Sequence, residues 1–302
     1  MAAPEPLVTH LQFGPALAEF TRGIAQELAG ELPELPSFPE VAVRVRDALA
    51  DEDIAIDDVV RIVSAEPSLA VRLLQLANSA ALNPAAQRVT TLRAAIARIG
   101  FDLARSATIA FAMSQMRRAE AWRGLEAHFH EIWQSSARLA AMSYSIARHQ
   151  ARPDADQALL AGMLHSMGKL FVLTRVSRFP SLLRDAAVRS EIENAWHARA
   201  ARVLLVKWEL PDEVLHAACD FSSVQEHSGA SAPGSLSDVL LAARHLVNVA
   251  DLAELANLAE PGGTAFLGAV PFARLGLDAK AVGEILSASA AEIASLMAAL
   301  AD

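Results

Sequence analysis

The chain has 302 residues, of which 53% are hydrophobic, so it is long enough to bury a substantial core. The apolar residues are mostly Ala, Leu, Val and Ile and only 5% of all residues are aromatic, which favours helices over sandwiches or barrels. A net charge of −9 argues against the broad basic surface that non-specific nucleic-acid binding needs. The lone Cys219 excludes an intramolecular disulfide and a Cys-rich zinc site, which fits a reducing compartment.

No segment predicts a secretory leader or a membrane span. The N-terminus, MAAPEPLVTHLQF, lacks the basic start and the continuous apolar core of a signal peptide. The segment from Leu159 to Leu173 comes closest to a span, but His165 and Lys169 interrupt it. We therefore expect a cytoplasmic protein without membrane insertion.

The first 40 residues predict a helix followed by an extended linker. Apolar residues at helical spacing predict a helix over residues 7–28, and Gly30 suits its C-terminal end. Three prolines in the segment ELPELPSFPE, residues 31–40, exclude a helix there, because proline lacks the backbone N–H that a helix interior requires.

A short amphipathic helix is predicted over residues 41–49, and two further short helices follow it. Asp57 and Asp58 are well placed at the start of one helix, whose positive dipole end they stabilise. Pro67 marks the first turn of the other, which ends near Asn78 and Ser79. These last two residues have two open interpretations: they cap the helix end, or they join the N-terminal helices to the second half of the chain.

The rest of the chain predicts further helices separated by loops. Thr90 or Thr91 is a candidate N-cap for a helix that ends at Gly100, and the strongly apolar segment from Leu159 to Leu173 is expected to be central and buried. A loop is predicted where the chain reads SSVQEHSGASAPGS. The remaining predicted helices cover residues 103–116, 125–149, 191–208, 214–219, 236–255 and 279–300.

Four segments in the first third resemble the N-terminal signature of HDOD domains in order and spacing. They run from Leu35 to Glu40, Ile62 to Leu69, Leu73 to Ser79, and Leu92 to Gly100. The resemblance implies an all-α, HD-domain-like bundle with an N-terminal helical subdomain and a C-terminal HD-like subdomain. It divides the chain into an N-terminal helix over 1–30, an HDOD domain over 31–222 and C-terminal helices over 223–302.

The segment GMLHSMGKL, residues 162–170, resembles the helix that carries the paired His-Asp of the HD superfamily. His165 stands at the His position, and Ser166 replaces the Asp. By the same resemblance, Ser135 stands where HD enzymes place their first His ligand, and Asp251 matches the last Asp ligand.

A metal-dependent phosphohydrolase needs several anionic or imidazole ligands around its cation, and two of these four positions carry hydroxyl groups. The resemblance therefore implies a protein that is not an enzyme and that binds no metal or cofactor. His165, Ser166, Ser135, Asp251 and Lys169 are candidates for a vestigial or binding site. Alternatively, His165 is a core imidazole that donates one hydrogen bond, with Asp251 as the acceptor.

The expected function is that of a non-catalytic regulatory module in bacterial signal transduction, with Pro67, Asn78 and Ser79 as family motif residues. The resemblance implies a protein partner on a separate chain and a link to cyclic-dinucleotide signalling, with no nucleic-acid partner. One alternative is a metal-dependent phosphohydrolase with atypical ligands. Another is a nucleotide-binding sensor without turnover. The sequence leaves the oligomeric state and the role of the last 45 residues open.

Overall fold

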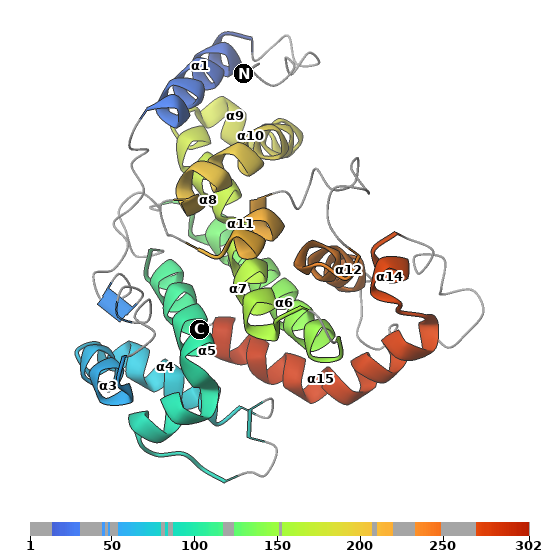
Figure 1. The fold of residues 1–302 in the computed structure, drawn as a ribbon. Coiled ribbons are helices and arrows are strands. Elements are labelled where there is room, and N and C mark those ends of the chain that lie inside the picture. The colour runs from blue at the N-terminus through green and yellow to red at the C-terminus, as the bar shows by residue number, and fades with distance from the viewer. Residues whose placement is uncertain are drawn as a thin grey trace.

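The computed structural model of the chain describes residues 14–30, 44–45, 48, 54–79, 82–83, 87–116, 124–150, 153–206, 210–219, 233–248 and 270–301. Every regular element in these ranges is a helix, so the predicted all-α class is confirmed. Figure 1 shows three groups of helices: one around α3 to α5, a central group around α6 and α7, and one around α8 to α10 that carries the N-terminal helix.

The N-terminal subdomain consists of α3 (Ile56–Ser64), α4 (Pro67–Ala77) and α5 (Leu92–Met116), which pack against one another. Pro67 lies at the start of α4, as predicted. Thr91 accepts a hydrogen bond from the backbone N–H of Ala94 at 3.3 Å and so confirms the candidate N-cap. Within α5 the chain is kinked at Gly100, whose φ of 78° separates the two predicted helices.

Asn78 joins the end of α4 to the segment that leads into α5. Its side-chain amide donates to the carbonyls of Leu74 and Val89, both at 2.8 Å, and its Oδ1 accepts from the N–H of Val89 at 2.8 Å. Ser79 is buried, and its hydroxyl has no hydrogen-bond partner among the described residues. Asn78 therefore both closes its helix and fastens the N-terminal subdomain internally, rather than reaching the HD-like half.

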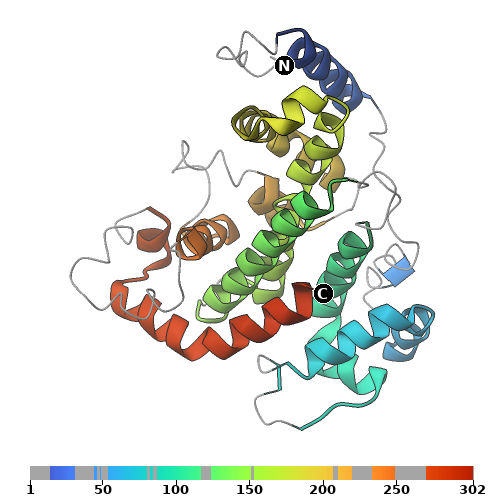
Figure 2. The same ribbon diagram turned by 180° about the vertical axis from the view of Figure 1, so that it is seen from behind.

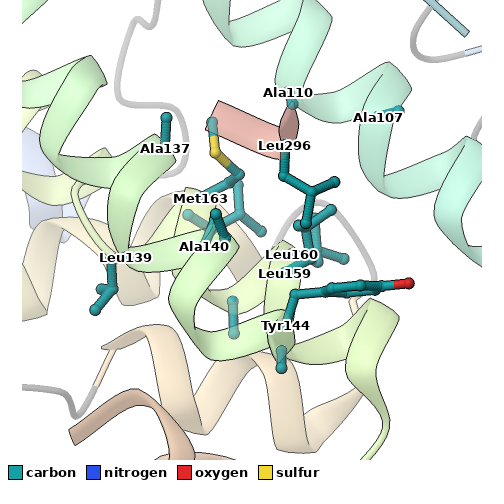
Figure 3. Packing of buried hydrophobic residues seen from close by; sticks show 14 of the residues in the cluster. Ala107, Ala110, Ala137, Leu139, Ala140, Tyr144, Leu159, Leu160, Met163 and Leu296 are labelled. Atoms are coloured by element: carbon teal, nitrogen blue, oxygen red, sulfur yellow. The ribbon is translucent and has the colours of Figure 1, made fainter. Parts of the chain in front are cut away.

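The central core lies between α6 (Glu126–Arg148), α7 (Ala155–Leu164) and α15 (Ala279–Ala301), with α5 on one side (Figure 3). Leu160 and Met163 of α7 are buried with Leu139 of α6 and Leu296 of α15 in one apolar cluster. The C-terminal helix therefore completes the main core. Two further helices, α12 (Leu236–Asn248) and α14 (Val270–Leu275), pack together beside α6.

The apolar segment predicted over 159–173 forms parts of two helices, α7 and α8 (Met167–Val176), which are separated at His165 and Ser166. Residues 155–176 are long and apolar enough to cross a membrane, but 94% of the apolar 18-residue stretch within this segment is buried inside the fold. Core helices of water-soluble proteins pass the same test, so this segment is weak support for a membrane span.

A second, smaller core forms where α1 (Gly14–Ala29) packs on α8, α9 (Pro180–Arg184) and α10 (Ala186–Val206), as both views of the fold show (Figure 2). Every third or fourth residue of α1 faces this core, which is the amphipathic pattern that predicts the helix. The buried residues of α1 are Leu17, Phe20, Ile24 and Leu28. The short helices α9 and α14 were not predicted, because five or six residues carry too little periodicity.

Candidate functional site

The junction between α7 and α8 is held close to α6, and this places two serines in contact. A Cβ added at Gly162 of α7 would lie 2.5 Å from the Cα of Ala140, so only glycine permits this approach of the two helices. The hydroxyls of Ser136 on α6 and Ser166 are 2.5 Å apart and fully or almost fully buried. Because Ser136 donates to the carbonyl of Ile132 at 2.9 Å, Ser166 donates to Ser136.

The resemblance places Ser135 at the first His ligand position, and the structure pairs Ser166 with the next residue, Ser136. Ser135 is exposed on α6, whereas Ser136 is buried. Adjacent helical residues are rotated by about 100°, so a shift of one position turns a side chain away from the core. Ser136 lies on the same buried stripe as Phe129, Trp133 and Ala140, and that spacing is the sequence signal that identifies it.

His165 follows the last residue of α7 and makes a local hydrogen bond. Its Nδ1 donates to the carbonyl of Gly162 at 2.7 Å. Burial lowers the pKa of His165 to about 4, and the positive charges of Lys169, His197 and Arg244 act in the same direction. The imidazole is therefore neutral at physiological pH. Asp251, its alternative partner, lies outside the described residues.

The α8 helix meets α10 directly behind this junction. A Cβ added at Gly168 would lie 1.8 Å from the carbonyl oxygen of His197, so the two backbones touch. His197 is 5% exposed, and its Nδ1 donates to the carbonyls of Glu193 and Asn194, both at 3.0 Å. Burial, together with the charge of Lys169, lowers the pKa of His197 as well.

Glu193 lies one turn before His197 on α10 and is paired with a basic side chain. Arg189, one further turn back, lies 3.7 Å from it in an ion pair. Burial raises the pKa of Glu193, while the charges of Lys169 and Arg189 oppose that rise. Arg189 also donates to the carbonyl of Leu183 at 2.9 Å, so its guanidinium binds two groups within the fold.

The described residues alone do not supply a set of ligands for a divalent cation. Among the described residues, no three His, Cys, Asp or Glu side chains are grouped closely enough to hold a metal ion. Ser136 and Ser166 satisfy each other, and the charged groups that act on His165 are basic. A metal site requires anionic or neutral donor atoms, and basic neighbours repel the cation.

Sequence reasoning missed His197 and Arg244 as members of this region. His197 is four residues after Glu193 and eight after Arg189, so a helical face of polar residues was visible in the sequence. Nothing in the sequence indicates that this face meets the residue pair at the α7–α8 junction, because they are about 30 residues apart along the chain. Lys169, in contrast, was predicted and lies in this region beside His165 and His197.

Known structures share this architecture. A provisionally named metal-dependent phosphohydrolase of Shewanella amazonensis SB2B has a TM-score of 0.66 and 20% identity, covering 89% of this chain and 98% of that one. An HDOD domain protein with unknown function from Geobacter sulfurreducens has a TM-score of 0.62 and 20% identity, with coverages of 94% and 98%. A provisionally named signal transduction protein of Marinobacter aquaeolei VT8 has a TM-score of 0.60 and 24% identity, with coverages of 94% and 65%. At these identities the similarity shows the fold alone.

The sequence comparisons identify the family. An uncharacterised protein of Treponema pallidum (strain Nichols) is 22% identical over 213 residues, which are 65% of this chain and 39% of the relative. The chain thus spans about two fifths of that curated relative. The HDOD domain profile matches residues 35–221, more than half of the chain. The chain therefore belongs to the HDOD domain family.

Proposed function

We propose that the chain is a non-catalytic module of bacterial signal transduction that acts by binding a protein partner or a small signalling ligand. The observation that carries the proposal is Ser166, which stands at the Asp position of the HD pair and is buried in a hydrogen bond with Ser136. A neutral hydroxyl brings no charge to a divalent cation and is a far poorer ligand than the carboxylate that it replaces. The provisional name of one structural relative, a signal transduction protein, agrees with this function.

The surroundings of His165 favour the same function. A hydrolytic HD site gathers negative charge around its metal, which then lowers the pKa of a bound water. Among the described residues, the charged neighbours that act on His165 include Lys169 and Arg244, whose side chains are positive. The alternative of a phosphohydrolase with atypical ligands would require those ligands to overcome this repulsion.

The first test is the metal content of the purified protein, measured by elemental mass spectrometry after incubation with Mn²⁺, Fe²⁺, Mg²⁺ and Zn²⁺ and removal of unbound ions. We expect far less than one ion per chain. The same samples are assayed with 4-nitrophenyl phosphate and bis(4-nitrophenyl) phosphate, and we expect no turnover above background.

Near-stoichiometric metal that disappears in His165→Ala and Asp251→Ala, together with turnover, would overturn the proposal. The matched control is His130→Ala, which removes an exposed imidazole on α6. Metal lost equally in that control would be bound at the surface rather than at the α7–α8 junction.

A further inference from the structure

The N-terminal helix α1 covers an apolar face that other helices build. Its buried residues share one hydrophobic cluster with α8, α9 and α10, and within the described residues none of them belongs to the main core. Both views of the fold place α1 at the outer edge of the molecule, with these three helices between it and α6 and α7 (Figure 1, Figure 2). We call the covered surface the α8–α10 face, and its members include Phe171, Val172, Val176, Leu182, Ile192 and Trp196.

The α8–α10 face belongs to the family domain, whereas its cover does not. The HDOD profile matches residues 35–221, which include all of α8, α9 and α10. The α1 helix, Gly14–Ala29, ends before the matched region begins. A face of large apolar side chains is unfavourable in water, so the domain requires an occupant for this surface.

The sequence of α1 makes a weak helix when it stands alone. The helix has 16 residues, with no acidic side chain in its first turn and no basic side chain in its last. Gly23 lies in its interior, where glycine disfavours the helix, and no packing requires it, because an added Cβ would meet nothing within 4 Å. Glu27 lies in the last turn, where a negative charge opposes the helix dipole. The order of α1 therefore depends on the α8–α10 face.

Two side chains of α1 are matched to this face rather than to the helix itself. Glu27 accepts from Nε of the buried Arg175 with both carboxylate oxygens, at 3.2 and 3.1 Å. Phe20, two turns earlier, meets the ring of Phe179 edge to face, with centroids 6.0 Å apart. The carboxylate that weakens the isolated helix is thus the group that recognises α8.

We propose that the α8–α10 face is a docking site for an amphipathic helix of a protein partner, and that α1 occupies this site until the partner displaces it. The partner helix carries apolar residues at the spacing of the buried stripe of α1 and a carboxylate immediately before the last of them. Seating an apolar helix stripe on such a surface is a common mode of protein recognition. The inference rests on the proposed function, because it names the surface and the partner class of a module that acts by binding.

The test uses the full chain and a fluorescein-labelled peptide of residues 14–30, with binding measured by fluorescence anisotropy. The wild-type chain is expected to bind the peptide weakly, because its own α1 competes at a high effective concentration. Glu27→Arg in the chain sets like charges against each other, so α1 undocks and we expect at least tenfold tighter peptide binding. Glu19→Arg is the matched control, since Glu19 is an exposed carboxylate of the same helix, and it should bind as the wild type does.

Reversing the charges on both sides separates docking from a loss of folding. The Arg175→Glu chain is expected to lose the wild-type peptide and to bind a peptide that carries Glu27→Arg. A peptide with Phe20→Ala should bind none of the chains tightly, because it lacks the aromatic contact with Phe179. An unfolded chain would not exchange one peptide for the other.

A stabilising variant tests the same competition from the opposite side. Gly23→Ala strengthens α1 as a helix and is expected to lower the affinity of the chain for the peptide about fivefold. Gly283→Ala in α15 is the matched control, because an added Cβ meets nothing within 4 Å at either position. Its peptide affinity is expected to equal that of the wild type. This comparison holds even if Glu27→Arg does not fold.

The outcomes separate the two proposals. Equal peptide affinities of the Gly23→Ala and Gly283→Ala chains, or no exchange of peptides by Arg175→Glu, would overturn the docking site and leave the non-catalytic function standing. Dimerisation of the wild type in sedimentation experiments that Arg175→Glu abolishes would assign the face to α1 of a second copy and overturn the partner helix. Metal-dependent turnover would overturn the non-catalytic function, while the peptide data would still assign the docking site.

Discussion

The two ends of α8 both carry basic side chains, and the fold treats them in opposite ways. At the C-terminal end, Arg175 is 7% exposed and donates from Nε to both carboxylate oxygens of Glu27, at 3.2 and 3.1 Å. It also donates to Thr174 at 2.6 Å and lies 3.7 Å from the centre of the Phe171 ring. At the N-terminal end, the neighbours whose charges act on His165 are all basic.

The Arg175 charge has a structural role. The Arg175 guanidinium is neutralised, hydrogen-bonded and stacked on an aromatic face, so it fixes α1 onto α8 and has little left to offer a ligand. At the other end, α8 is positioned by the backbone contact of Gly168 with His197 on α10.

The largest effect is expected at the balanced end. Glu27→Ala leaves the Arg175 charge buried without its carboxylate and is expected to lower the free energy of unfolding by about 4 kcal/mol, measured by urea denaturation. Glu19→Ala, an exposed carboxylate on the same helix, should change it by less than about 0.5 kcal/mol. The double variant Glu27→Leu/Arg175→Met should recover most of the loss. Equal values for Glu27→Ala and Glu19→Ala would show that the ion pair does not hold α1.

The next effect tests the backbone contact between α8 and α10. Gly168→Ala forces a methyl group against the backbone of His197 and is expected to cost about 3 kcal/mol of stability, because two helix backbones must separate. Gly283→Ala in α15, where an added Cβ meets nothing within 4 Å, should instead stabilise the helix by up to about 1 kcal/mol. Thermal unfolding of both variants checks the opposite signs. A stable Gly168→Ala protein would contradict the close contact.

The pH dependence of stability comes next in size. Because folding depresses the pKa of His165 to about 4, its contribution is present above its ordinary pKa of 6.5 and is lost as the pH falls from 6.5 towards 4. Allowing for solvent screening, we expect a loss of about 2 kcal/mol over this window, which His165→Gln should abolish. Denaturation at pH 4.5, 5.5 and 7 measures it, and an unchanged slope in the variant would contradict the assignment.

The ionisation of Asp156 changes the free energy of unfolding in the opposite direction, so Asp156 is replaced when the contribution of His165 is measured. Burial, assisted by the charges of Asp154 and Asp102, raises its pKa from 3.8 to about 6. Its stabilising contribution is therefore present below 3.8 and is lost as the pH rises through about 6. The His165 comparison is made in an Asp156→Asn background, in which the apparent acid destabilisation should be larger.

The smallest expected effect concerns which serine of α6, Ser135 or Ser136, faces Ser166. Ser166→Ala removes one buried hydrogen bond and is expected to cost about 1 kcal/mol, whereas Ser135→Ala at an exposed position should cost less than about 0.5 kcal/mol. Ser136→Ala should resemble Ser166→Ala and not Ser135→Ala. Urea denaturation measures the free energy of unfolding of the three variants. The largest loss in Ser135→Ala would contradict the pairing of Ser136 with Ser166.

Much of the fold could be predicted from local patterns. The α1 helix follows from apolar residues at a spacing of three or four, and the start of α4 follows from Pro67, whose missing N–H is harmless in a first turn. The kink at Gly100 was predicted as a helix end. The break at His165 and Ser166 was not, because apolar residues at helical spacing continue on both sides of these two residues and no proline stands between them.

The sequence by itself determined the all-α class and the HDOD resemblance, because each depends on residue types at short spacing. Only the tertiary structure decided which serine faces Ser166 and that His197 lies against Gly168 of α8. The reason is physical: helix periodicity fixes which residues share a face of one helix, but the pairing of faces depends on how closely two backbones approach. Here that approach is set by Gly162 against α6 and Gly168 against α10.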